Sequence, residues 1–164
     1  MKGKKNLLVI PDCHAAPEYD NDRFTALGKF IVNKQPDIIV CLGDFGDMPS
    51  LSSYDKGTKG FEGRRYKKDV DSILDAQDKL FAPIKKFNEN KRKRKEKQYK
   101  PKMHMCLGNH EDRIDRAINS APELEGAISM KDLHYEKNGW KITPFKGCLS
   151  LEGINFSHYF TSGV

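Results

Sequence analysis

Three groups of metal-ligand and proton-transferring side chains each follow an apolar stretch of the sequence. They are Asp12 with His14, Asp44 with Asp47, and Asn109 with His110. Carboxylates and imidazoles together suit a divalent transition metal, and both types also transfer protons in catalysis. Each group alone is also compatible with an ordinary turn or capped loop, because Gly, Asn and Asp favour such positions.

The apolar stretches before these groups are predicted β-strands. Residues 6–10, 37–42 and 102–107 are almost continuously apolar, which is typical of parallel strands buried on both faces. Helices are predicted between Asp22 and Gln35 and over residues 70–87, with Pro83 as a kink or break. Because parallel strands end at one edge of a sheet, the pattern predicts an α/β fold in which the three groups converge.

The rest of the chain is predicted to contain fewer long elements. Ser50 to Gly63 is rich in Gly, Ser and Lys and is predicted to be a long loop over the site. A helix is expected after Glu111, and a second short helix between Ala121 and Asp132. Alternating stretches follow and predict an antiparallel meander, namely residues 140–145, 148–151 and 154–158.

Length and composition describe one rather polar domain, residues 1–164. Hydrophobic residues make up 37% and charged residues 32% of the chain. No run approaches the ~18 apolar residues of a membrane span, and Asn6 to Ile10 is too short for the core of a signal peptide. Four cysteines lie in or beside apolar runs without paired spacing, which favours reduced, buried thiols in a cytoplasmic protein.

The net charge of +6 is concentrated in one run. Lys91 to Lys102 is strongly basic, which favours nucleic acid or another phosphate-rich partner. The alternative is a solvated helix end with no partner. Residues 91–97 contain no aromatic side chain, so the stacking platform of a single-strand binder is absent there.

Considered together, the motifs resemble a known family. Four blocks stand in order along the chain: Asp12-x-His14, Gly43-Asp44-x-x-Asp47, Gly108-Asn109-His110-Glu111 and His158. They look like four of the five blocks of the calcineurin-like metallophosphoesterases. The resemblance implies a two-sheet β-sandwich flanked by helices, with a two-metal site at the strand ends. It also implies metal-dependent hydrolysis of phosphoesters, by a phosphatase or a phosphodiesterase.

The resemblance assigns a role to each residue. Asp12 and His14 would bind the first divalent ion, and Asp44 would bridge both ions. Asn109 and His158 would hold the second ion. The resemblance points to manganese, whereas the ligand types also suit iron or zinc.

Two further residues would serve catalysis itself. His110 would protonate the leaving oxygen or contact the phosphate, and Asp47 would orient it. Glu111 after His110 favours a phosphatase over the family's repair nucleases.

The sequence also departs from the family pattern. Met48-Pro49 stands where the phosphoprotein phosphatases carry Arg-Gly, and Leu107 stands where they carry Arg. Arg113 is a candidate for the phosphate contact instead, and the alternative is an arginine on the surface of a helix. The fifth block, Gly-His-x-His, does not follow His158. The carboxyl-terminal part of the fold is therefore expected to be incomplete, with a sheet edge open to a partner chain that completes the site.

Three functions remain open from the sequence. The first is a metal-dependent phosphoesterase acting on a phosphoester substrate. The second is a non-catalytic fragment that binds nucleic acid through Lys91 to Lys102 or pairs with another chain. The third is a nuclease of the same family.

Overall fold

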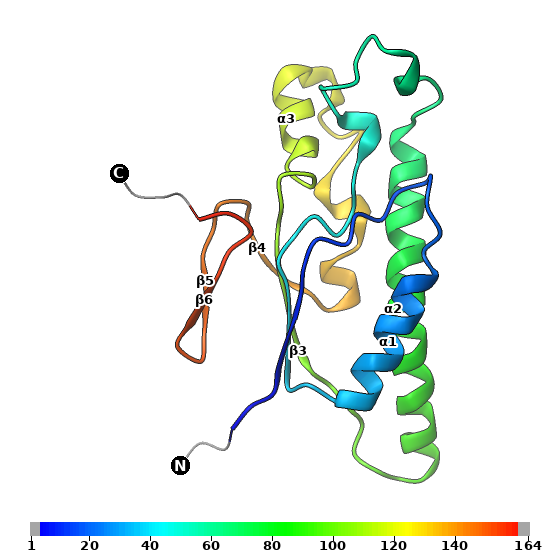
Figure 1. Ribbon diagram of the computed structural model, residues 1–164, viewed down its shortest axis with the longest axis vertical. Helices are drawn as coiled ribbons and strands as arrows, with labels where there is room; N and C mark the ends of the chain where they lie inside the picture. Colours follow the sequence, from blue (N-terminus) through cyan, green and yellow to red (C-terminus); the bar gives the residue numbers. More distant parts are fainter. Residues whose placement is uncertain (1–3, 161–164) are drawn as a thin grey trace.

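A parallel sheet lies between two long helices and a small β-hairpin (Figure 1). The computed structural model describes residues 4–160. The sheet has the strand order β1 (Leu7–Ile10), β2 (Ile38–Cys41), β3 (Lys102–Cys106) and β4 (Lys141–Thr143). The antiparallel pair consists of β5 (Leu149–Leu151) and β6 (Ile154–Phe156). The α-helices are α1 (Asp22–Lys34), α2 (Tyr66–Lys93) and α3 (Arg113–Ser120).

Strand β2 shows why the apolar runs have no polar alternation. Ile39 and Cys41 belong to the large core that also contains residues of α1 and α2. Ile38 and Val40 belong to a smaller core that includes Phe156 of β6. Because successive side chains of a strand point to opposite faces, a sheet covered on both faces needs apolar residues at every position. The prediction of parallel strands is confirmed, and β2 is buried along its whole length, whereas the edge strand β1 buries only Ile10 and leaves Val9 38% exposed.

The first three strands end level with one another. Ile10 of β1 pairs with Cys41 of β2, which in turn pairs with Met105 of β3. The segments that follow these strands therefore start at the same edge of the sheet. The expected convergence of the three motif groups has its structural basis here.

The prediction for residues 140–145 is wrong in strand direction. β4 is not part of an antiparallel meander but pairs in parallel with β3, with His104 opposite Lys141. An alternating pattern of three residues carries no information on direction. The long connection through residues 107–140 brings the chain from the carboxyl end of β3 back toward its amino end before β4 begins. A strand that starts there must run parallel to β3. Residues 149–156 do form the predicted antiparallel pair.

Two helix predictions are met only in part. α2 continues through Pro83 without a break, and α1 lies so close that a Cβ on Gly28 would be 2.3 Å from the carbonyl oxygen of Leu80. This close packing supports the helix around the proline. Residues 121–132 contain no α-helix but parts of two short 3-10 helices, Pro122–Leu124 and Met130–Leu133. Gly126, with a φ of 80°, separates them.

The cysteines, the segment between β2 and α2, and the length of the helices can also be compared with the predictions. All four cysteines are free thiols as expected, but only Cys41 and Cys106 are buried, whereas Cys148 is exposed. The segment between β2 and α2 is irregular as predicted, apart from the 3-10 turns Pro49–Leu51 and Lys59–Phe61. Within residues 4–160, no helix has the length and apolar character that a membrane crossing requires.

Candidate metal centre

Two glycines let the loops after β2 and β3 approach each other closely. Gly43 has a φ of 103°, and a Cβ there would lie 2.5 Å from the nitrogen of Gly108. A Cβ on Gly108 would lie 2.0 Å from Oδ1 of Asp44. The two loops therefore pack backbone to backbone, and the backbone N–H of His110 donates to Oδ1 of Asp44 at 2.9 Å. This contact brings the second and third motif groups together.

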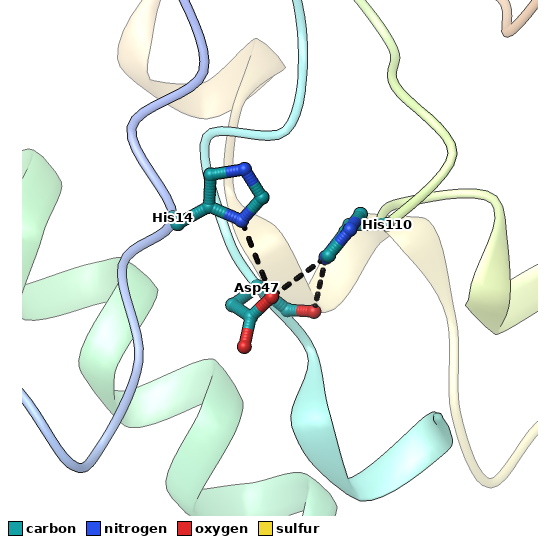
Figure 2. Close-up of side chains that lie close together, drawn as sticks. All are labelled: His14, Asp47 and His110. Atoms are coloured by element: carbon teal, nitrogen blue, oxygen red, sulfur yellow. Dashed lines mark hydrogen bonds and ion pairs between the residues drawn. The ribbon is translucent and has the colours of Figure 1, made fainter. Parts of the chain in front are cut away.

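Asp47 lies between two histidines (Figure 2). Its Oδ1 is 2.7 Å from Nδ1 of His110 and 3.2 Å from Nδ1 of His14. The carbonyl oxygen of Asp47 also lies 2.7 Å from Nδ1 of His110. Because both oxygens accept, Nδ1 of His110 carries the proton, and its Nε2 is left facing Asp44 Oδ2 at 3.6 Å.

His158 extends this cluster from the far end of the chain. Its Nδ1 donates to the carbonyl oxygen of Leu42 at 2.8 Å. In the neutral ring, the Nε2 lone pair then faces Oδ1 of Asn109 at 2.9 Å and Oδ2 of Asp44 at 3.5 Å. Three electron-pair donors that face one another repel unless a proton or a metal cation lies between them.

A second set of donors lies around Asp12. Ligand atoms of Asp12, His14 and Asp44 all lie within 4.8 Å of one another, as do those of His14, Asp47 and His110. Asp44 is buried, with 3% of its surface exposed, whereas the Asp12 side chain is half exposed. His14 belongs to both of these sets, and Asp44 connects Asp12 and His14 to Nε2 of His158. Imidazole and carboxylate donors grouped in this way fit a divalent transition metal. All seven ligand or catalytic residues predicted from the sequence therefore lie in one cluster.

The buried carboxylate of Glu111 holds the two loops in place. Glu111 is fully buried, and its Oε2 accepts hydrogen bonds from the backbone N–H groups of Asp44 and Gly108, each at 2.9 Å. Its Oε1 accepts from the N–H of Gly46 at 3.1 Å and from the hydroxyl of Tyr135 at 3.0 Å. Sequence reasoning used Glu111 only as a family signature and missed Tyr135, which stands in no motif.

The backbone around the centre adopts uncommon conformations. His14, Asp44 and Met48 have φ values of 49°, 47° and 50°, in the left-handed region that non-glycine residues seldom occupy. Such conformations persist where surrounding contacts enforce them, and they cluster at functional sites. Arg23 supplies one such contact, because its Nη2 donates to the carbonyl oxygens of Cys13 and His14 at 3.0 and 3.1 Å.

Arg113, like Arg23, donates hydrogen bonds to backbone carbonyl oxygens of a loop in the cluster. Its Nη1 donates to the carbonyl oxygens of Asp47 at 2.6 Å and Met48 at 3.2 Å. Its Nη2 lies 3.4 Å from Nε2 of His110. The guanidinium predicted to contact phosphate is thus half-buried against the loop that carries Asp47.

The charges of the cluster shift two pKa values in opposite directions. The hydrogen bond from His110 lowers the pKa of Asp47 to about 2, against the opposing effect of burial. Burial disfavours the charged form of His110, but its bonds to Asp47 and the charge of Asp44 outweigh burial and raise its pKa. The pair therefore favours a carboxylate beside a protonated imidazole.

Comparison with known proteins agrees with this geometry. A search of curated proteins finds no match. The sequence profile of the calcineurin-like phosphoesterases matches residues 5–162, nearly the whole chain. The clustered histidines and acidic residues lie within that range. The chain therefore belongs to the calcineurin-like phosphoesterase family, whose members are metal-dependent hydrolases.

Proposed function

We propose that this protein hydrolyses phosphoesters with two divalent metal ions bound at the carboxyl edge of the sheet. The position of Asp44 carries this proposal. Its carboxylate lies within 4.8 Å of the ligand atoms of Asp12 and His14, and its Oδ2 lies 3.5 Å from Nε2 of His158. One buried carboxylate between two donor sets is the arrangement that a bridged pair of cations needs.

The ligands divide between the two ions as follows. Asp12, His14 and Asp44 would hold the first ion. Asp44, Asn109 and His158 would hold the second ion, with His158 oriented through its Nδ1 bond to Leu42. The uncharged amide of Asn109 keeps the negative charge of the second set lower than another carboxylate would.

The chain's own proton donor would be His110. Two bound divalent cations supply positive charge to the phosphoryl oxygens and lower the pKa of a coordinated water. His110 keeps the proton on Nδ1 because Asp47 accepts it, so Nε2 is the atom that would protonate the leaving oxygen. Asp47 fixes the orientation of the ring and stabilises its charged form.

The basic run lies away from the metal centre, so its position does not favour a nuclease. Lys91 to Lys102 extends from the last turn of α2 to the first residue of β3, whereas Asp69 near the amino end of α2 accepts a hydrogen bond from the N–H of Ser50, three residues after Asp47. We therefore favour small phosphoesters or phosphoproteins as substrates, in a reducing compartment such as the cytoplasm, where four free thiols persist.

Metal content and hydrolysis, measured on the same samples, test the proposal. After incubation with Mn²⁺ and desalting, we expect about two ions per chain and hydrolysis of p-nitrophenyl phosphate or its bis-ester, lost with a chelator. Zn²⁺ and Fe²⁺ are compared in parallel. Asp44→Asn should abolish metal retention and activity, and Asp115→Asn on the exposed face of α3 should preserve both. Equal activity of the two variants would contradict the proposal.

The ligands that complete the coordination of each ion can come from a second chain or from water and substrate. Three protein donors for each ion leave positions that water, substrate or a residue of another polypeptide can fill. If a partner chain supplies ligands, metal retention and activity per chain should rise together with protein concentration. Concentration-independent values would assign the remaining positions to water and substrate.

A further inference from the structure

We propose that the basic surface at the carboxyl end of α2 binds the phosphate backbone of a nucleic-acid duplex. We define the basic end as residues 85–102. These residues include ten Lys or Arg and two Glu, a net charge of +8, so the remaining chain has a net charge of −2. The net positive charge of the chain therefore comes from residues 85–102, separate from the acidic metal centre.

The basic end is a fixed structure rather than a loose tail. α2 ends at Lys93, and Lys95 adopts a φ of 58° that turns the chain back along the helix. Asn88 then forms two hydrogen bonds with the backbone of Tyr99, one as donor and one as acceptor, each at 2.8 Å. The hydroxyl of Tyr99 donates to the carbonyl oxygen of Pro36 at 2.8 Å. The bonds with Asn88 hold the returning segment against α2, and the bond to Pro36 holds it against the loop before β2.

This fold-back groups four cations around one open groove. Arg92, Lys95, Lys97 and Lys100 line a hollow of about 510 Å³ together with Glu96 and Gln98. Glu96 is already paired with Lys91 at 3.3 Å and Arg94 at 3.0 Å. Within residues 4–160, the four lining cations form no ion pair, so their charge is free for an external anion.

The side chains of the basic end indicate which kind of anion it binds. None of the large apolar side chains exposed between residues 4 and 160 falls within the basic end. Protein interfaces and membrane-inserting surfaces rely on such apolar anchors, whereas contact with a phosphate backbone needs only charge. Tyr99 is half-buried with its hydroxyl occupied, so the stacking platform of a single-strand binder is missing. A duplex backbone fits these properties.

The basic end is also too far from the metal centre for the two to share one phosphate. α2 has 28 residues and runs from the end of the molecule near α3 to the opposite end (Figure 1). Asp69 accepts a hydrogen bond from the N–H of Ser50, in the loop that carries Asp47, and the helix between Asp69 and Arg92 is roughly 35 Å long at ~1.5 Å per residue. Duplex binding should therefore require neither the metal nor its ligands.

Binding of a labelled duplex of about 20 base pairs tests the proposal, with fluorescence anisotropy measured between about 50 and 200 mM salt. We expect the affinity of the parent protein to fall by about two to three orders of magnitude over this range. The variant Arg92→Gln/Lys95→Gln/Lys97→Gln/Lys100→Gln should bind more weakly, with a salt slope reduced by about 3 to 4. Thermal unfolding checks that it folds.

Matched variants separate this inference from the hydrolase proposal. Lys56→Gln/Lys59→Gln/Lys131→Gln/Lys137→Gln removes the same charge from exposed positions elsewhere and should leave duplex binding nearly unchanged. Asp44→Asn should bind duplex like the parent, and the basic-end variant should hydrolyse p-nitrophenyl phosphate at the parent rate. Equal loss of binding in the two quadruple variants would overturn the inference. Tighter binding to anionic vesicles than to duplex would also overturn it.

Discussion

The backbone N–H of Asp44 donates to the carboxylate of Glu111 at 2.9 Å, although the two residues are 67 positions apart. The same oxygen accepts from Gly108, and the other oxygen accepts from Gly46 and Tyr135. One carboxylate without solvent exposure thus fixes the spacing of the two loops that carry most of the candidate ligands. Burial raises the pKa of Glu111, and these hydrogen bonds work against that rise.

Glu111→Gln should weaken both the fold and the metal centre. The amide can offer only one acceptor oxygen, so at least one buried N–H or O–H loses its partner, at a cost of about 1–3 kcal/mol. Metal affinity should fall roughly 10- to 100-fold, as for other residues that orient ligands. Calorimetric titration with Mn²⁺ and denaturant unfolding measure the two effects. Glu123→Gln, exposed on a 3-10 turn, is the control, and an equal response of both variants would contradict the anchoring role.

Gly108→Ala should separate the two loops. The added methyl would lie 2.0 Å from Oδ1 and 2.5 Å from the nitrogen of Asp44, both fixed in the cluster. Overpacking of this kind costs about 1–3 kcal/mol. At Gly60 the nearest atom to an added Cβ is 3.8 Å away, so Gly60→Ala should change stability by less than about 0.5 kcal/mol. Chemical denaturation compares the two, and a neutral Gly108→Ala would show that the loops can move apart freely.

The ends of the first three strands could be predicted from the sequence, because each strand is marked by a local run of apolar residues. Continuous apolar runs predict buried strands, and strands that are parallel neighbours bring Asp12, Asp44 and Asn109 to one edge without knowledge of any side-chain contact. The direction of β4 could not be predicted, because it depends on how the chain crosses from α3 back to the sheet.

Long-range contacts account for the other omissions. Tyr135 reaches Glu111 from a turn with no motif, and the left-handed backbone of His14 depends on Arg23. The exposure of Cys148 depends on the position of the hairpin rather than on its apolar neighbours. Such features follow from tertiary packing, which local patterns do not encode.

Asp69→Asn should change the pH dependence of stability. Asp69 is 1% exposed, and burial raises its pKa despite the hydrogen bond from Ser50. A carboxyl whose pKa is higher in the folded state binds more protons there, so stability falls as pH rises from the unfolded value of about 4 through the folded value. The neutral amide does not titrate. Relative to the parent, the variant should therefore gain stability between pH 4 and pH 7.

Urea unfolding at several pH values measures this difference. Asp71→Asn, on the exposed face of the same helix, should show no such gain. A parent-to-variant difference that stays constant between about pH 4 and pH 7 would mean that Asp69 is not held in its neutral form by burial.

Arg113→Lys distinguishes a clamp on the Asp47 loop from a phosphate contact. Lysine keeps the charge but loses the planar fork that bonds the carbonyl oxygens of Asp47 and Met48. If Arg113 acts as a clamp, the variant should lose about 1–3 kcal/mol of unfolding free energy. Its kcat should fall, because Asp47 would no longer hold the His110 ring in place.

A phosphate contact predicts another pattern, in which KM for p-nitrophenyl phosphate rises while unfolding is unchanged. Arg65→Lys serves as the control, because Arg65 is exposed and, among the described residues, its side chain bonds only the neighbouring carbonyl of Arg64. Since both carbonyl contacts and the 3.4 Å approach to Nε2 of His110 place the guanidinium against the loop, we expect lower stability and lower kcat with little change in KM.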